Sequence, residues 1–176
     1  MNTKQLTLSA ILLAVGALLH TIVPGFVLGM KPDFLLSMMF ISMLIFPNKN
    51  NYIATSVSCG LISALTTQFP GGQLPNIVDK LITGLIVGFL IYLLSKTSIN
   101  HVAKSVIIGT IGTLISGSTF LLVASVLVGL PGGASFLALF IGAVVPAILF
   151  NGFCVPLFYI LVKRIVISTP QFKSLL

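Results

Sequence analysis

The chain has 176 residues, of which 57% are hydrophobic and only 6% are charged. A soluble domain carries roughly 25% charged residues, so this composition excludes a soluble globular protein and predicts a protein that resides in a lipid bilayer. The formal net charge of +7 does not indicate nucleic-acid binding, because the basic residues are spread thinly between long apolar runs.

Apolar runs separated by turn-forming residues divide the chain into six predicted membrane-spanning helices, since one span needs about 20 apolar residues. In chain order, the predicted helices cover residues 5–23, 33–47, 51–68, 77–95, 104–128 and 136–163. The second is short, at about 15 residues, and is expected to tilt or to reach into the preceding loop. The last contains Pro146 and Pro156, which predict a kink. We therefore expect an all-α protein with one integral membrane domain over residues 1–176.

The distribution of Lys and Arg predicts the orientation of the chain, because cytoplasmic loops of membrane proteins are enriched in these residues. Alternate loops, together with both ends of the chain, hold seven of the nine basic residues: Lys4, Lys49, Lys96, Lys104, Lys163, Arg164 and Lys173. The remaining loops hold only Lys31 and Lys80. This asymmetry places both termini in the cytoplasm and makes Lys31 and Lys80 exceptional on the outer side.

The only two acidic residues of the chain lie beside these two outer lysines, as Lys31-Pro32-Asp33 and as Asp79-Lys80. Ionisable residues within a membrane protein are costly and usually mark a binding site or a pathway. Two carboxylates and two ammonium groups at one membrane face are suited to a zwitterion such as an amino acid. In a structural alternative, the aspartates cap the second and fourth helices and the lysines pair with them. The two hypotheses are compatible, since a capping residue can also form the wall of a pocket.

Other polar residues are expected at the depth of the charged quartet. His20 lies near the outer end of the first helix, and Gln73 and Asn76 lie in the loop before the fourth. The third helix ends with Thr66, Thr67 and Gln68. Aromatic walls are expected from Phe26, Phe69, Phe136 and Phe140. A ligand pocket needs a few placed polar groups among apolar walls, so these residues complete a candidate site. Asn151, in the middle of the last span, is instead expected to bond a neighbouring helix.

Motifs for catalysis and for energy conversion are missing from the sequence. It contains neither a Gly-x-x-x-x-Gly-Lys-Ser/Thr loop nor a His-Glu-x-x-His motif. Cys59 and Cys154 fall in apolar runs and are expected to be packing residues rather than a disulfide or metal pair. We therefore expect no enzyme activity, no metal and no cofactor. No carboxylate is expected at mid-membrane, where a proton relay would usually need one, so the energy source is expected outside this chain.

Six predicted spans, an outer pocket and an Ala10-x-x-x-Ala14 stripe on the first helix resemble the substrate-binding (S) components of energy-coupling factor transporters. A narrower resemblance is carried by Ala14 to His20 with Pro24, Gly29-Met30-Lys31-Pro32-Asp33, Ile45-Phe46-Pro47, Ile62-Ser63-Ala64-Leu65-Thr66-Thr67, and the run from Phe69 to Lys80. The second half contributes its hydropathy and Gly129-Leu130-Pro131-Gly132-Gly133. By these segments, the chain resembles the bacterial tryptophan transporter family called TrpP.

The resemblance implies uptake of L-tryptophan, or of a related aromatic amino acid, through the bacterial cytoplasmic membrane. It implies capture on the outer side, with the loop 24–32 as a lid. From the charged residues themselves, we expect Asp33 and Asp79 to contact the ligand ammonium and Lys31 or Lys80 to contact its carboxylate. It also implies a transmembrane coupling subunit and two ATPase subunits as partners, with Ala10 and Ala14 at their contact. Two alternatives are an S component for a vitamin such as thiamine or riboflavin, and a membrane scaffold that transports nothing.

Overall fold

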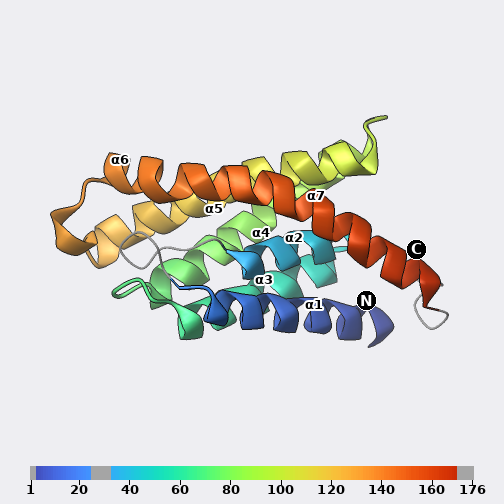
Figure 1. Ribbon diagram of the computed structural model, residues 1–176, viewed down its shortest axis with the longest axis horizontal. Helices are drawn as coiled ribbons and strands as arrows, with labels where there is room; N and C mark the ends of the chain where they lie inside the picture. Colours follow the sequence, from blue (N-terminus) through green and yellow to red (C-terminus); the bar gives the residue numbers. More distant parts are fainter. Residues whose placement is uncertain (1–2, 25–32, 170–176) are drawn as a thin grey trace.

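The computed structural model describes residues 3–24 and 33–169, and within these residues it contains helices and turns but no strands (Figure 1). The longer helices are α1 (Thr3–Ile22), α2 (Phe34–Ile45), α3 (Lys49–Thr66), α4 (Gln73–Ser95), α5 (His101–Leu127) and α7 (Val145–Ser168). A 3-10 turn η1 (Pro131–Gly133), the short α6 (Phe136–Leu139) and a π-helical turn η2 (Phe140–Val144) connect α5 to α7. The all-α prediction is confirmed for the described residues.

Among the described residues, four helical stretches are long and apolar enough to cross a membrane: Thr3–Ile22, Gln73–Ser95, His101–Leu127 and Phe136–Ser168. The helix α2 is apolar but has only 12 residues, and α3 is less apolar than the other long helices. The helices therefore support a multi-pass membrane protein, while the number of six spans stays a prediction. Both ends of the described chain lie at the same end of the bundle (Figure 1). Following the predicted orientation, we call this the inner end and the opposite one the outer end.

The short helix α2 lies at the centre of the bundle. The side chains of Leu35, Met39, Phe40 and Ile41 are completely buried, as expected for a helix that is apolar on all faces. Its 12 residues measure roughly 18 Å along the axis, so a helix that ends at the inner end begins well inside the bundle. The residue before it, Asp33, is therefore held at depth rather than at the membrane surface.

The start of α4 corrects the sequence analysis. The helix begins at Gln73, four residues before the predicted Ile77, because Pro75 is accommodated in the first turn of a helix, where no N–H partner is needed. Gly72 is its N-cap, with no side-chain bond to the helix. Asp79 consequently lies in the second turn, and the hypothesis that it caps this helix is wrong.

Close approach of α3 and α4 depends on glycine. A Cβ atom on Gly88 would lie 2.7 Å from Cδ2 of Tyr52, and one on Gly84 would collide with the Ser56 side chain. Small residues at such spacing let membrane helices pack closely. The glycine stripe of α4 therefore serves packing inside this bundle.

Two neutral polar clusters connect other helices. At the inner end, the Ser–Asn cluster consists of Ser9, Ser42 and Asn51. Ser9 Oγ donates to Asn51 Oδ1 at 2.8 Å, Ser42 Oγ donates to Ser9 Oγ at 2.8 Å, and Asn51 Nδ2 donates to the Ser42 carbonyl at 3.1 Å. Nearer the middle, Asn151 accepts from Ser37 Oγ at 2.8 Å and donates to Thr113 Oγ1 at 2.9 Å. The prediction that Asn151 bonds neighbouring helices is confirmed.

Candidate functional site

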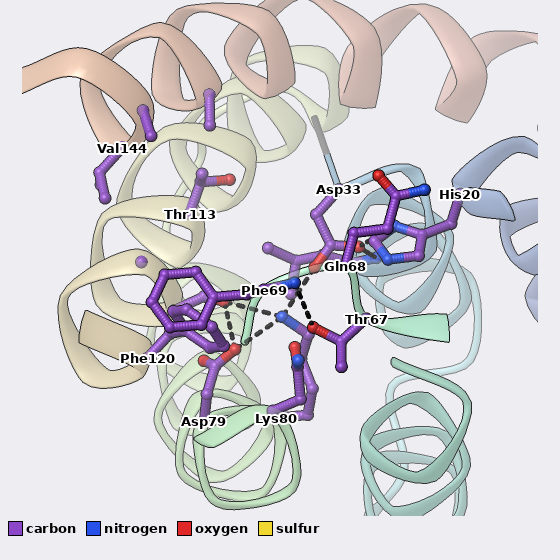
Figure 2. Close-up of a pocket in the computed structure, with 16 residues that line it drawn as sticks. His20, Asp33, Thr67, Gln68, Phe69, Asp79, Lys80, Thr113, Phe120 and Val144 are labelled. Carbon is purple, nitrogen blue, oxygen red and sulfur yellow. Dashed lines mark hydrogen bonds and ion pairs between the residues drawn. The ribbon is translucent and has the colours of Figure 1, made fainter. Parts of the chain in front are cut away.

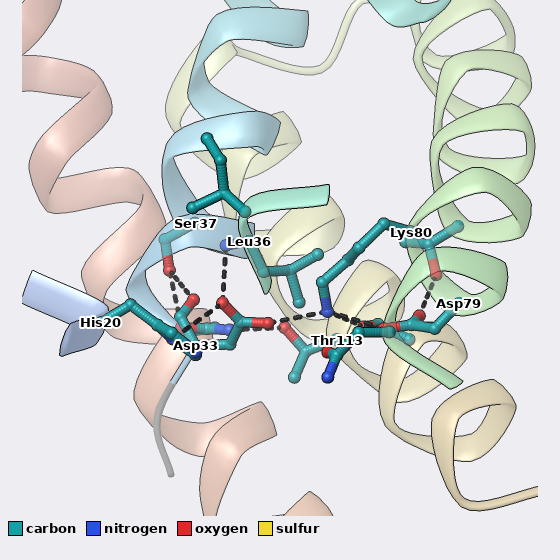
Figure 3. Close-up of polar contacts among 12 residues, drawn as sticks. His20, Asp33, Leu36, Ser37, Asp79, Lys80 and Thr113 are labelled. Carbon is teal, nitrogen blue, oxygen red and sulfur yellow. Dashed lines mark hydrogen bonds and ion pairs between the residues drawn. The ribbon is translucent and has the colours of Figure 1, made fainter. Parts of the chain in front are cut away.

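Lys80 is the centre of a buried ionic cluster in the outer half of the bundle. Its Nζ atom lies 2.7 Å from Asp33 Oδ2 and 2.6 Å from Asp79 Oδ2 (Figure 3). The same atom lies 3.1 Å from Ser116 Oγ. An ammonium group has three donors, and these three oxygens account for all of them. The contacts join α4 to α5 and to the start of α2.

Asp79 is the most deeply buried carboxylate, with its side chain 1% exposed. Its Oδ1 accepts from Thr83 Oγ1 at 2.9 Å, one helical turn further along α4, and its Oδ2 accepts from Ser116 Oγ at 2.9 Å as well as from Lys80. A buried charge is tolerated only where it is paired and hydrogen-bonded, and Asp79 meets both conditions.

Asp33 combines two roles that the sequence left open. As the N-cap of α2, its Oδ1 accepts from the backbone N–H of Leu36 at 2.9 Å, while its Oδ2 pairs with Lys80. His20 Nδ1, from α1, lies 3.5 Å from the same Oδ1. The Asp33 side chain is 18% exposed, so it is the more accessible of the two carboxylates. Capping and ion pairing therefore coexist at Asp33.

The secondary structure explains why these groups meet. The first residue of α4 precedes Asp79 by six positions, which places the carboxylate roughly 9 Å below the outer end of the helix. Asp79 and Thr83 are separated by four residues and share one face. Because α2 begins inside the bundle, Asp33 reaches the same depth. Two carboxylates and one ammonium group then carry a formal charge of −1.

A cavity of about 90 Å³ opens beside the ionic cluster (Figure 2). Its wall combines the polar groups of the ionic cluster with apolar side chains such as Phe69 and Phe120. The lining residues are His20, Asp33, Leu36, Thr67, Gln68, Phe69, Asn76, Asp79, Lys80, Thr113, Ser116, Gly117, Phe120, Ala143, Val144 and Ala147. The volume is below the roughly 300–1,000 Å³ typical of ligand pockets, so an amino-acid ligand would require the walls to move.

The apolar wall contains an aromatic pair and an irregular helix. Phe69 and Phe120 meet edge to face, with ring centroids 5.0 Å apart and planes at 83°. Ala143 and Val144 belong to the π-helical turn η2, which directly precedes α7 and its Pro146. Turns of this kind inside α-helices often occur at functional sites. Val144 packs against Gly117, where a Cβ atom would lie 2.6 Å from Val144 Cγ1.

Most of the predicted site residues gather at this cavity. His20, Asp33, Asn76, Asp79 and Lys80 all line it. Gln73 is exposed at the first turn of α4 and does not belong to the lining residues. Lys31 and Phe26, with most of the predicted lid at 24–32, lie outside the described residues. Phe69 contributes to the wall as expected. Phe136 and Phe140 stack with ring centroids 6.1 Å apart and pack against the apolar cluster of Phe69 and Phe120, but they are not among the lining residues.

The contribution of α5 was missed in the sequence analysis. Thr113, Ser116 and Phe120 are spaced by three and four residues, so they lie on one face of α5, and this face lines the cavity. Polar residues at helical spacing within an apolar span were the available signal. Across residues 3–24 and 33–169, no three His, Cys, Asp or Glu side chains gather as metal ligands would.

Comparison with known proteins gives a consistent result. The model of the family described as tryptophan transporter TrpP matches residues 2–167. A probable tryptophan transport protein of Bacillus subtilis strain 168 is 43% identical over 165 residues, which cover 94% of each chain. A probable tryptophan transport protein of Clostridium acetobutylicum is 44% identical over 164 residues, covering 93% of this chain and 94% of the relative. No solved structure matches the chain.

Proposed function

The chain belongs to the tryptophan transporter family TrpP, and from this membership we propose that it takes up L-tryptophan by capturing it in the cavity beside Asp33, Asp79 and Lys80. It is a multi-pass protein of the cell membrane and belongs to a transporter family, not to an enzyme family. One observation carries the proposed site: both carboxylates of the sequence meet a single lysine at a cavity with aromatic walls.

The ammonium group of the ligand is proposed to bind at the carboxylates. The cluster of Asp33, Asp79 and Lys80 has a formal charge of −1, so it favours one additional positive group. Asp33 offers the more exposed oxygens, at 18% against 1% for Asp79. A hydrogen bond to a charged group contributes about 1.5–3 kcal/mol, so this contact has the strength to orient the ligand.

The carboxylate of the ligand is proposed to bind Lys80 through an exchange of partners. In the structure, all three donors of Lys80 are engaged by Asp33, Asp79 and Ser116. When a ligand ammonium replaces the Lys80 ammonium at Asp33, the lysine becomes available to the ligand carboxylate. After the exchange, the ligand ammonium pairs with Asp33, while Lys80 pairs with Asp79 and with the ligand carboxylate. No buried charge is therefore left without a partner.

The indole ring is proposed to bind against Phe69 and Phe120. Aromatic rings favour offset-stacked or edge-to-face contacts, and the existing pair can open to admit a third ring, which would also enlarge the 90 Å³ cavity. The vitamin alternatives fit less well, because thiamine and riboflavin carry no carboxylate that could bind Lys80. The proposed exchange of partners therefore favours an amino acid over either vitamin.

The energy is proposed to come from partner subunits, as in energy-coupling factor transporters. The sequence has no nucleotide-binding loop of the Walker type. On α1, Leu12, Leu13 and Gly16 are buried in the bundle, whereas Ala10 and Ala14 are exposed. Two exposed alanines one turn apart suit close contact with another membrane helix. We therefore assign this face to a transmembrane coupling subunit that acts with two ATPase subunits.

Calorimetry on the purified chain in detergent tests the capture site. L-Tryptophan is expected to bind without any ATPase present. Tryptamine, which lacks the carboxylate, and indole-3-propionate, which lacks the ammonium group, should each bind at least about tenfold more weakly, since one charge-assisted contact is lost. Thiamine serves as the comparator for a vitamin. Absence of tryptophan binding in a folded sample would contradict capture by this chain alone.

Uptake measurements in cells test the partner face. Ala14→Trp should block close helix approach, so tryptophan uptake should fall several-fold while binding to the isolated chain is retained. Leu122→Trp on α5, another exposed apolar position at 56% exposure, is the control and should retain uptake. Equal loss of uptake and binding in Ala14→Trp would mean that Ala14 acts in packing within this chain.

A further inference from the structure

A second and larger cavity lies away from the ionic cluster, in the inner half of the bundle. It is a groove of about 1,060 Å³ along the surface where α3 and α4 meet. The lining residues are Pro47, Asn48, Lys49, Tyr52, Ile53, Ser56, Leu81, Gly84, Leu85, Gly88, Phe89, Ile91, Tyr92 and Ser95. None of them lines the cavity beside Lys80.

The walls of this groove are apolar and accessible. Ile53, Leu85 and Phe89 are 58%, 71% and 61% exposed, and the bottom is formed where Gly84 and Gly88 bring the two helices close together. On α4 the lining runs from Leu81 to Ser95, a distance of roughly 21 Å at 1.5 Å per residue. One leaflet including its headgroups measures roughly 20–22 Å, half of a bilayer of 40–45 Å. The groove therefore has the length of one phospholipid.

The inner end of the groove is basic. Lys49 lines it, and Lys96, directly after the lining residue Ser95, places its Nζ atom 4.4 Å from the centre of the Tyr92 ring. Both carboxylates of the sequence contact Lys80 in the outer half. Among the described residues, therefore, no aspartate neutralises Lys49 or Lys96. Basic residues thus lie at one end of the groove and apolar residues along the rest of it. This arrangement matches an anionic lipid, which has a charged headgroup at one end and apolar acyl chains along the rest.

We propose that this groove is a binding site for one anionic phospholipid, with its acyl chains along Ile53, Leu85 and Phe89 and its phosphate at Lys49 and Lys96. Basic pockets between membrane helices on the cytoplasmic side bind anionic headgroups in this way. The Lys96–Tyr92 contact holds the ammonium group beside the groove. A helix of another protein would cover the apolar walls but would have no general need for two unneutralised lysines at one end.

Native mass spectrometry of the purified full-length chain tests this proposal, with phosphatidylglycerol and phosphatidylcholine of identical acyl chains as probes. One phosphatidylglycerol should be retained at least about fivefold more strongly than phosphatidylcholine. A basic side chain near an anionic lipid surface contributes about 1 kcal/mol, so Lys49→Gln and Lys96→Gln should each weaken retention about fivefold. Lys163→Gln is the matched control, because Lys163 also lies over a tyrosine, Tyr159, at 5.8 Å, but does not line the groove.

A second variant tests the apolar half. Leu85→Trp fills the groove from an exposed position, so it should reduce retention of phosphatidylglycerol several-fold while the helix content in circular dichroism is unchanged. Equal retention of both lipids would overturn the proposal, and so would an equal effect of Lys163→Gln and Lys49→Gln. Loss in Leu85→Trp without any loss in the two lysine variants would mean an apolar occupant, such as a partner helix, and would also overturn it.

Discussion

Two buried polar clusters join the helices at opposite halves of the bundle, and they differ in charge and in access. The Ser–Asn cluster of Ser9, Ser42 and Asn51 is neutral, fully hydrogen-bonded and lines neither of the two cavities. The ionic cluster around Lys80 is also hydrogen-bonded, but it contains three charges and lines a cavity.

This difference separates what the fold needs from what a ligand needs. Neutral hydrogen bonds between membrane helices contribute about 0.6 kcal/mol each on average, and those of the Ser–Asn cluster connect α1, α2 and α3. A buried charge pair costs several kcal/mol of desolvation per ion. Neutral hydrogen bonds could join α2, α4 and α5 without this cost. The position of that costly arrangement beside a cavity is consistent with selection for ligand binding.

Lys80→Met should break the ionic cluster with the largest effect. It leaves Asp33 and Asp79 buried without their shared cation, and removal of one partner from a buried ion pair typically costs 3–5 kcal/mol. We expect a loss of about 3 kcal/mol or more in unfolding free energy and no measurable tryptophan binding. Thermal unfolding and calorimetry measure the two effects, with Lys163→Met as the control. A stable Lys80→Met protein that binds tryptophan normally would contradict both roles of the lysine.

Asp33→Asn should separate binding from folding. Asparagine is as good an N-cap as aspartate, and Lys80 keeps Asp79 as its partner, so stability should change by less than about 1 kcal/mol. Tryptophan affinity should fall about tenfold to a hundredfold, because one charge-assisted contact to the ligand is lost. Calorimetry measures the affinity.

The control for Asp33→Asn is Asp33→Ala, which removes the cap as well as the charge. It should lose about a further 1 kcal/mol of stability with no further loss of affinity. Unchanged affinity in a folded Asp33→Asn protein would leave Asp33 with only its capping role.

The charged residues of the ionic cluster could be predicted from the sequence, because charged residues are rare in membrane segments. Asp33, Asp79 and Lys80 are conspicuous in a chain that is only 6% charged, and all three meet in the structure. Ser116 and Thr113 could not be selected in the same way, since serine and threonine are common in membrane helices. Their spacing defines a face of α5 but not the helix that it contacts.

A second limit on prediction from the sequence came from the local structure at the start of α4. Proline is favoured in the first helical turn as well as in loops, so α4 begins before Pro75, and Asp79 lies further from the helix end than the predicted start at residue 77 implied. The small size of the cavity depends on how Phe69, Phe120 and Val144 pack. Such packing involves residues distant in sequence, so no local pattern could indicate it.

Asn51→Ala should weaken the fold and leave binding intact. The side chain accepts from Ser9 and donates to the carbonyls of Ser42 and Phe46, so its removal takes one hydrogen bond from each of these three buried groups. We expect a loss of about 1–3 kcal/mol in unfolding free energy, measured by thermal unfolding. Tryptophan affinity should be retained in the folded fraction, and a large loss of affinity would contradict the division between the two clusters.

A matched pair of serine variants should give the smallest and most discriminating effects. Ser116 Oγ accepts from Lys80 at 3.1 Å and donates to Asp79 at 2.9 Å, whereas Ser42 Oγ donates to Ser9 at 2.8 Å. Each Ser→Ala change removes one hydroxyl from a buried helix interface, so each should cost about 0.6–1.5 kcal/mol of stability. Only Ser116→Ala should also reduce tryptophan affinity, by about threefold to tenfold, because it loosens the position of the Lys80 ammonium group. If Ser42→Ala reduced affinity equally, tryptophan binding would depend on the stability of the whole bundle rather than on the geometry around Lys80.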